Sequence, residues 1–157
     1  MITWLIDMGY IVKAGKGRFK LDYIQARKLI EDGLNDRCHA VVFNSVDKRY
    51  GVDRGLAQFY HTIQEAGFTV NLYQMEGGGQ KQVDVALASH GVWRAAQGDT
   101  IVLTSGDVDF LPACKIIVEA AKRKLILFTY DFGIHGDLVE IAAEHWLFED
   151  YPQLERV

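Results

Sequence analysis

The fold of this chain is decided by the stretch Thr104-Ser105-Gly106-Asp107-Val108-Asp109-Phe110. It follows a short apolar run, residues 101–103, and precedes a helical pattern that starts near Leu111. We therefore expect it to be the loop at the carboxyl end of a buried strand, where open α/β sheets bind their ligands. Asp107 and Asp109 stand close enough to repel each other, and a divalent cation would offset that repulsion. A polar turn in which Asp109 caps the following helix is an equally open interpretation.

The composition is typical of a globular protein. We expect one domain that covers residues 1–157. Hydrophobic residues make up 49% of it, and the net charge is −4, so no basic surface announces a nucleic-acid partner. A metal that neutralises phosphate would remove the need for such a surface. The two cysteines, Cys38 and Cys114, lack metal-ligand spacing and are expected to be buried free thiols. The first residues lack a signal-peptide pattern and no apolar run has membrane-spanning length, so we expect a cytoplasmic protein.

Apolar runs and helical patterns alternate along the chain. Strands are expected at 4–6, 40–43, 68–73, 101–103, 125–130 and 145–148, the last at a sheet edge, and helices at 21–33, 56–67, 83–96, 111–122 and 137–144. Asp22 is the expected N-cap and Gly33 the expected end of the first helix, while Gly9 permits a turn. Residues 13–20 are expected to form a basic loop, either a solvated linker or a loop that contacts phosphate, 44–49 a loop at the sheet edge and 76–82 a flexible stretch. The alternation predicts an α/β fold of three layers, with helices on both faces of a mainly parallel sheet.

Four aspartates are expected at one edge of that sheet. Asp7 ends the first strand, Asp107 and Asp109 follow the fourth, and Asp84, in the first turn of a helix, can reach the same place. For Asp84 alone, a favourable interaction with the helix dipole is the structural alternative. Oxygen ligands without matching arginines suit Mg²⁺ or Mn²⁺ and, through the metal, phosphodiester hydrolysis. Whether one or two metals bind stays open.

Four segments resemble the NYN/LabA-like branch of the PIN-domain superfamily. They are Leu5-Ile6-Asp7, Leu21-Asp22-Tyr23, Lys81-Gln82-Val83-Asp84-Val85-Ala86-Leu87-Ala88 and the 104–112 stretch. The resemblance implies a Rossmann-like α/β/α fold and a Mg²⁺- or Mn²⁺-dependent ribonuclease acting on single-stranded or structured RNA. It implies that Asp7, Asp84, Asp107 and Asp109 are the catalytic metal ligands, with Asp7 and Asp107 the firmest.

The resemblance also implies substrate contacts. Ser105 and Thr104 would position a ligand or phosphate by hydrogen bonds, and Lys81 would contact a substrate phosphate. Two positions depart from the family pattern: Tyr10 stands where an asparagine is usual, and His90 where a second acid is common. Tyr10 is expected either to stack on a base or to be partly buried. His90, six residues from Asp84 on a helix, is expected to point away from the acids as a satisfied or exposed histidine.

Two other functions stay open at this stage. One is an RNA-binding or regulatory module of the same fold with little or no turnover. The other is a phosphatase of the haloacid-dehalogenase type, but that chemistry needs a second aspartate two residues after Asp7, where this chain has Gly9. A serine-hydrolase motif G-x-S-x-G and zinc-spaced histidine pairs are absent from the sequence. Trp93, Phe128 and residues 146–148 leave a homodimer open.

Overall fold

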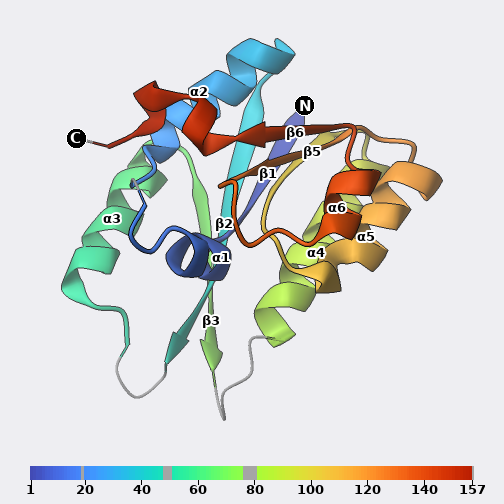
Figure 1. Cartoon of the computed structure of the whole chain (residues 1–157). Coiled ribbons are helices and arrows are strands. Elements are labelled where there is room, and N and C mark those ends of the chain that lie inside the picture. Colours follow the sequence, from blue (N-terminus) through green and yellow to red (C-terminus); the bar gives the residue numbers. More distant parts are fainter. Residues whose placement is uncertain (19, 48–50, 76–80, 157) are drawn as a thin grey trace.

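A six-stranded parallel sheet forms the centre of the molecule, with the strand order β3-β2-β1-β4-β5-β6 (Figure 1). The computed structural model describes residues 1–18, 20–47, 51–75 and 81–156. The strands are β1 (Ile2–Asp7), β2 (Cys38–Asp47), β3 (Thr69–Met75), β4 (Thr100–Thr104), β5 (Leu125–Thr129) and β6 (Glu144–Leu147). The predicted α/β class and parallel sheet are confirmed, including the edge position of the last strand.

Helices cover both faces of the sheet. One face carries α1 (Met8–Ala14), α2 (Tyr23–Leu34) and α3 (Arg54–Glu65), and the other carries α4 (Lys81–Ala96), α5 (Leu111–Lys115), the π-helical turn η2 (Ile116–Ala120) and α6 (Gly136–Ile141). Short 3₁₀ turns lie at η1 (Val108–Phe110), η3 (Phe148–Asp150) and η4 (Pro152–Leu154). Alternate residues of β1 separate the two cores: Trp4 and Ile6 pack under α1–α3, and Leu5 packs under α4 and α5.

The first helix is an addition to the sequence prediction. A turn was expected at Gly9, but α1 begins at Met8 because Asp7 is its N-cap and accepts a hydrogen bond from Tyr10 N. The helix buries Met8, Tyr10, Ile11 and Ala14 against the sheet. This short helix directly continues the first strand and turns the chain away from the sheet edge.

Three further boundaries differ from those expected. Helix α2 has its predicted N-cap, Asp22, but ends at Asn35 in a left-handed conformation (φ 51°) and not at Gly33. Strand β2 continues to Asp47, so the loop predicted from residue 44 starts later. The flexible stretch predicted at 76–82 lies outside the described residues over 76–80, and its last two residues begin α4.

The aromatic residues considered for a subunit contact are divided between core and surface. Phe128 and Phe148 are fully buried, whereas Trp93 is 53% exposed and Trp146 half-buried. Both cysteines are buried and free, as expected. Over the described ranges, none of the helices combines the length and apolar character needed to cross a membrane.

Candidate active site

Strands β1 and β4 lie side by side, and the chain leaves them toward opposite faces of the sheet. After β1 it enters α1 on one face, and after β4 it enters η1 and α5 on the other. This is the position at which doubly wound sheets open a crevice at the carboxyl ends of their strands. Asp7 ends β1 and Ser105 follows β4, so both stand at the crevice.

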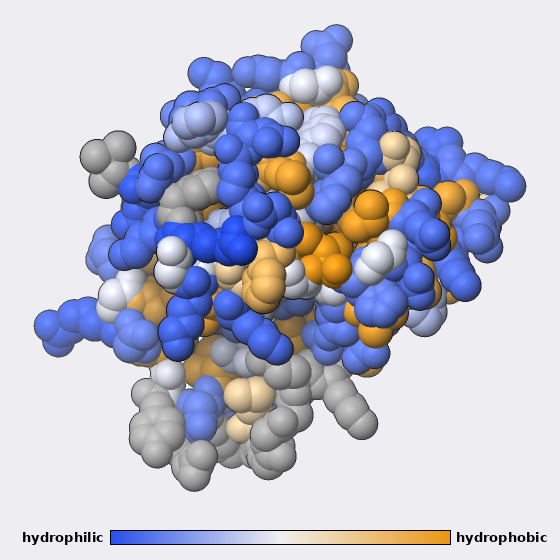
Figure 2. Space-filling model, in the orientation of Figure 1, coloured by the Kyte–Doolittle hydropathy of each residue, from blue (hydrophilic) through white to orange (hydrophobic). Residues whose placement is uncertain are grey.

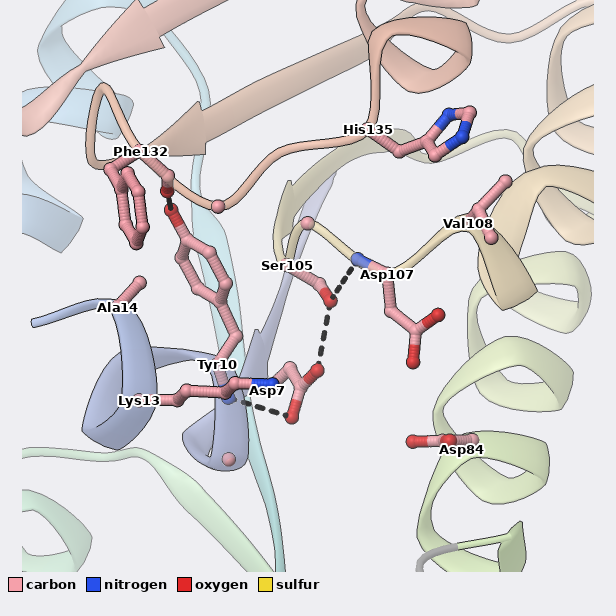
Figure 3. Close-up of a pocket in the computed structure, with 13 residues that line it drawn as sticks. Asp7, Tyr10, Lys13, Ala14, Asp84, Ser105, Asp107, Val108, Phe132 and His135 are labelled. Carbon is pink, nitrogen blue, oxygen red and sulfur yellow. Dashed lines mark hydrogen bonds between the residues drawn. The ribbon is translucent and has the colours of Figure 1, made fainter.

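Asp7 and Ser105 form a buried pair. The Ser105 hydroxyl donates to Asp7 Oδ2 at 2.8 Å and accepts a 3.4 Å hydrogen bond from the backbone N–H of Asp107 (Figure 3). Only 7% of Asp7 and none of Ser105 is exposed. Burial raises the pKa of Asp7, and the Ser105 hydrogen bond acts in the opposite direction. Ser105 therefore keeps a desolvated carboxylate fixed at the base of the crevice.

Asp107 and Asp109 lie at the start of η1, directly after Ser105 in the chain. Asp107 is the N-cap of this turn and accepts a 2.9 Å hydrogen bond from Asp109 N. The cap is thus Asp107, and the interpretation of Asp109 as the helix cap is corrected. Both aspartates are exposed, which leaves their remaining oxygens accessible to a ligand.

Asp84 completes the group from the first turn of α4. Ligand oxygens of Asp84, Asp107 and Asp109 lie within 4.8 Å of one another, and we refer to these three residues as the acidic cluster. Desolvation raises the pKa of Asp84 to about 6, with added repulsion from Asp7, Asp107 and Asp109. Asp7 is outside the three-residue group, but its charge reaches Asp84, and both carboxylates face the same space in Figure 3.

The acidic cluster fits a hard divalent cation. Three convergent carboxylates supply oxygen ligands only, which is the donor set that Mg²⁺ and Mn²⁺ prefer. The mutual repulsion that raises the pKa of Asp84 is the cost that such a cation would offset. Three of the four acids expected at this edge thus converge, and Asp7 lies outside that group but close enough for its charge to act on Asp84.

A pocket of about 720 Å³ opens beside these acids. Its walls are formed by Asp7, Gly9, Tyr10, Lys13, Ala14, Asp84, Ser105, Gly106, Asp107, Val108, Phe132, Gly133 and His135. In Figure 3, Asp84 and Asp107 lie on one side of the pocket, Ala14 and Phe132 lie on the other, and His135 lies over Val108 on the side of the acids. The pocket therefore combines carboxylates with a lysine, a histidine and aromatic rings.

The residues predicted to contact substrate lie in different environments. Ser105 lines the pocket, as does Tyr10, which is only 8% exposed and uses its hydroxyl to bind backbone groups. Thr104 is fully buried, accepts from Trp4 Nε1 at 2.8 Å and donates to Phe128 O at 2.6 Å. The prediction that Thr104 positions a phosphate is wrong, because its hydroxyl forms both of these hydrogen bonds inside the core. The side chain of Lys81 is outside the described part of the structure.

His90 lies away from the acidic cluster, as expected from its helical spacing. Its ring packs near Phe43 and Trp93, at centroid distances of 5.9 and 5.7 Å. Burial lowers the pKa of His90, and its Nε2 is buried without a hydrogen-bond partner among the described residues. It is therefore neither the exposed nor the satisfied histidine that was expected.

Three pocket residues were not singled out from the sequence: Lys13, Phe132 and His135. The sequence places Lys13 in the basic loop 13–20, and it places Phe132 and His135 in a turn between the strand 125–130 and the helix 137–144. Their available signal was position, since the turn follows β5 at the same edge of the sheet as Asp107. Residue types alone did not indicate that this turn folds back onto the 104–110 loop.

Comparisons with known proteins bear on the family and the fold of this chain. The family model described as NYN domain matches residues 2–147. A search of curated proteins found no match. A crystal structure of a protein of unknown function from Vibrio parahaemolyticus is 20% identical and superposes with a TM-score of 0.80, covering 95% of this chain and 93% of that one. That similarity supports the fold, and the family match over most of the chain identifies it: this protein belongs to the NYN domain family.

Proposed function

We propose that this protein is a metal-dependent ribonuclease that hydrolyses RNA phosphodiester bonds. The observation that carries the proposal is the acidic cluster, with Asp7 beside it, at the carboxyl edge of the sheet in a chain of the NYN domain family. NYN domains are generally nucleases. Among the described residues, the clustered carboxylates have no evident structural role unless a cation binds between them.

In this proposal, Asp84, Asp107 and Asp109 hold Mg²⁺ or Mn²⁺, and Asp7 completes the site directly or through water. When bound, the cation would neutralise phosphate charge and help to deprotonate an attacking water. The chain's own contribution is orientation. Ser105 fixes Asp7 by a 2.8 Å hydrogen bond, and the helix-cap geometry fixes Asp107.

Cleavage of a labelled RNA pool tests the proposal, with Mn²⁺, with Mg²⁺ and with chelator. We expect metal-dependent cleavage that Asp107→Asn abolishes, because the amide keeps the cap oxygen but loses the negative charge. Asp32→Asn is the matched control, since Asp32 is an exposed carboxylate on α2 outside the pocket.

The alternatives give different results in the same series. RNA binding that is independent of metal, without cleavage, would refute the nuclease and favour a binding or regulatory module. Hydrolysis of a small phosphoester without RNA cleavage would favour a phosphatase, although Gly9 in the pocket lacks the carboxylate that phosphatase chemistry needs.

A further inference from the structure

We propose that Phe132 is the stacking position for a nucleobase of the RNA substrate, across the pocket from the acidic cluster. This inference rests on the proposed ribonuclease function and adds a subsite to it. Phe132 is 59% exposed, although it is a large apolar side chain, and it lines the same pocket as Asp7, Asp84 and Asp107. Figure 2 shows that this face of the protein is mainly hydrophilic, with a hydrophobic area near its middle.

The Phe132 ring is held in place by neighbouring groups. The Arg18 guanidinium lies 5.3 Å from the ring centroid, and Arg18 forms ion pairs with Asp131 and, at 2.8 Å, with Glu149. The Tyr10 hydroxyl donates to Phe132 O at 2.9 Å. These contacts orient an aromatic ring that remains largely in solvent, so its hydrophobic area adds little to folding stability. Exposed aromatic rings beside cationic groups are the usual stacking platforms for single-stranded nucleic acid.

The position of Phe132 relative to the catalytic loop is fixed by backbone contact. His135 N donates to Gly106 O at 3.0 Å, and a Cβ added to Gly106 would lie only 1.8 Å from Gly133 O. The segment 131–135 is therefore packed directly on the loop that carries Asp107. A base stacked on Phe132 would be placed at a defined position relative to the acids.

Two further residues that line the pocket, Lys13 and His135, offer donors for phosphate. Lys13 forms no hydrogen bond or ion pair within the described residues, so its ammonium group is available. His135 Nδ1 accepts from Asp137 N at 3.2 Å, which places the proton of the neutral ring on Nε2 as a second donor. A nucleotide combines a flat base with a charged phosphate. The apolar ring of Phe132 suits the base, and the cationic and neutral donors suit the phosphate. The pocket volume of about 720 Å³ is that of a small-molecule site.

Binding of labelled single-stranded RNA to the full chain tests the subsite, by fluorescence anisotropy with chelator and with Mn²⁺. Removing a base-stacking ring typically weakens binding by about tenfold or more, and we expect this of Phe132→Ala. Phe132→Trp should retain affinity, while Phe132→Leu, which is apolar without a π face, should not. Trp93→Ala is the matched control, because Trp93 is 53% exposed and has the Arg94 guanidinium 5.0 Å from its ring, but lies outside the pocket.

RNAs with one abasic position supply the decisive comparison. Moving the abasic site along the strand should reveal a position that weakens binding to the wild type but causes no further loss in Phe132→Ala. Equal affinity of wild type and Phe132→Ala, equal loss in Trp93→Ala, or no RNA binding under either condition would overturn the proposal. Because binding in chelator is measured without cleavage, a wild type that stacks RNA on Phe132 but never cuts it when Mn²⁺ is added would refute the nuclease and leave this subsite standing.

Discussion

Replacing Ser105 with alanine should show how strongly the fold depends on one buried hydrogen bond at the site. The Ser105 hydroxyl donates to Asp7 Oδ2 at 2.8 Å, and neither side chain has appreciable exposure. After the substitution, Asp7 keeps only backbone partners, a long hydrogen bond from Tyr10 N at 3.4 Å and a weaker interaction with the backbone N–H of Gly9. The variant therefore leaves a buried carboxylate without its short side-chain hydrogen bond.

The magnitude follows from the kind of bond that is lost. A hydrogen bond to a charged group contributes about 1.5–3 kcal/mol, and water cannot easily replace it at a buried site. For a chain of this length, each kcal/mol corresponds to roughly 2–4 °C in melting temperature. We therefore expect Ser105→Ala to lower the melting temperature by roughly 3–12 °C at pH 8.

The loss should depend on pH in a defined direction. Burial raises the pKa of Asp7 above its usual 3.8, and the hydrogen bond from Ser105 lowers it, so the variant raises it further. The folded state then holds the Asp7 proton more tightly than the unfolded state, and the penalty for the buried charge is relieved as the pH falls through the folded pKa. The cost of Ser105→Ala is thus greatest at pH 8 and smaller at pH 4.5.

Thermal unfolding of both proteins without metal, at pH 8 and pH 4.5, measures this difference. Ser89→Ala is the matched control, since Ser89 is exposed on α4 and its loss should change stability by less than about 0.5 kcal/mol. An unchanged melting temperature in Ser105→Ala, or the same loss at both pH values, would show that the Ser105 hydrogen bond does not stabilise a buried Asp7 carboxylate.

Three more variants or conditions extend the test. Because the pKa of Asp84 is raised to about 6, the metal-free protein should gain stability as the pH falls from 8 through 6. Mn²⁺ should stabilise the protein more at pH 8 than at pH 5. In melting scans, Asp84→Asn should reduce both effects. Gly106→Ala should destabilise the chain by more than ~3 kcal/mol, because its Cβ would meet Gly133 O at 1.8 Å, whereas Gly136→Ala, which meets no atom within 4 Å, should be near neutral in denaturant unfolding. Thr104→Val should cost about 1–3 kcal/mol in the same measurement, since it leaves buried partners unpaired, without changing Mn²⁺ affinity by calorimetry.

The sequence predicts both the parallel sheet and the meeting of the acids at one of its edges, and the second prediction follows from the first. Short continuous apolar runs bounded by turn residues, such as Ile101-Val102-Leu103, are typical of buried strands, and strands that alternate with helices give a parallel sheet. Once the sheet is parallel, residues after each strand meet at one edge, so the convergence of Asp7 with Asp107 follows from topology.

Features that depend on tertiary contact were beyond prediction. Thr104 and Ser105 are adjacent polar residues, yet Thr104 points into the core toward Trp4 and Ser105 toward Asp7. Their difference is the alternation of a strand end, whose register the sequence does not define to one residue. Phe132 reaches the pocket because Gly106 lets its segment pack close, a contact between residues far apart in the chain.

Anomalous diffraction from crystals soaked in MnCl₂ locates the ion and so shows whether the acidic cluster binds a metal. We expect a manganese peak between Asp84, Asp107 and Asp109, at about 2.0–2.3 Å from carboxylate oxygens, that disappears in Asp107→Asn. A wild-type crystal with no peak at the acidic cluster, or with manganese bound only elsewhere, would contradict this expectation.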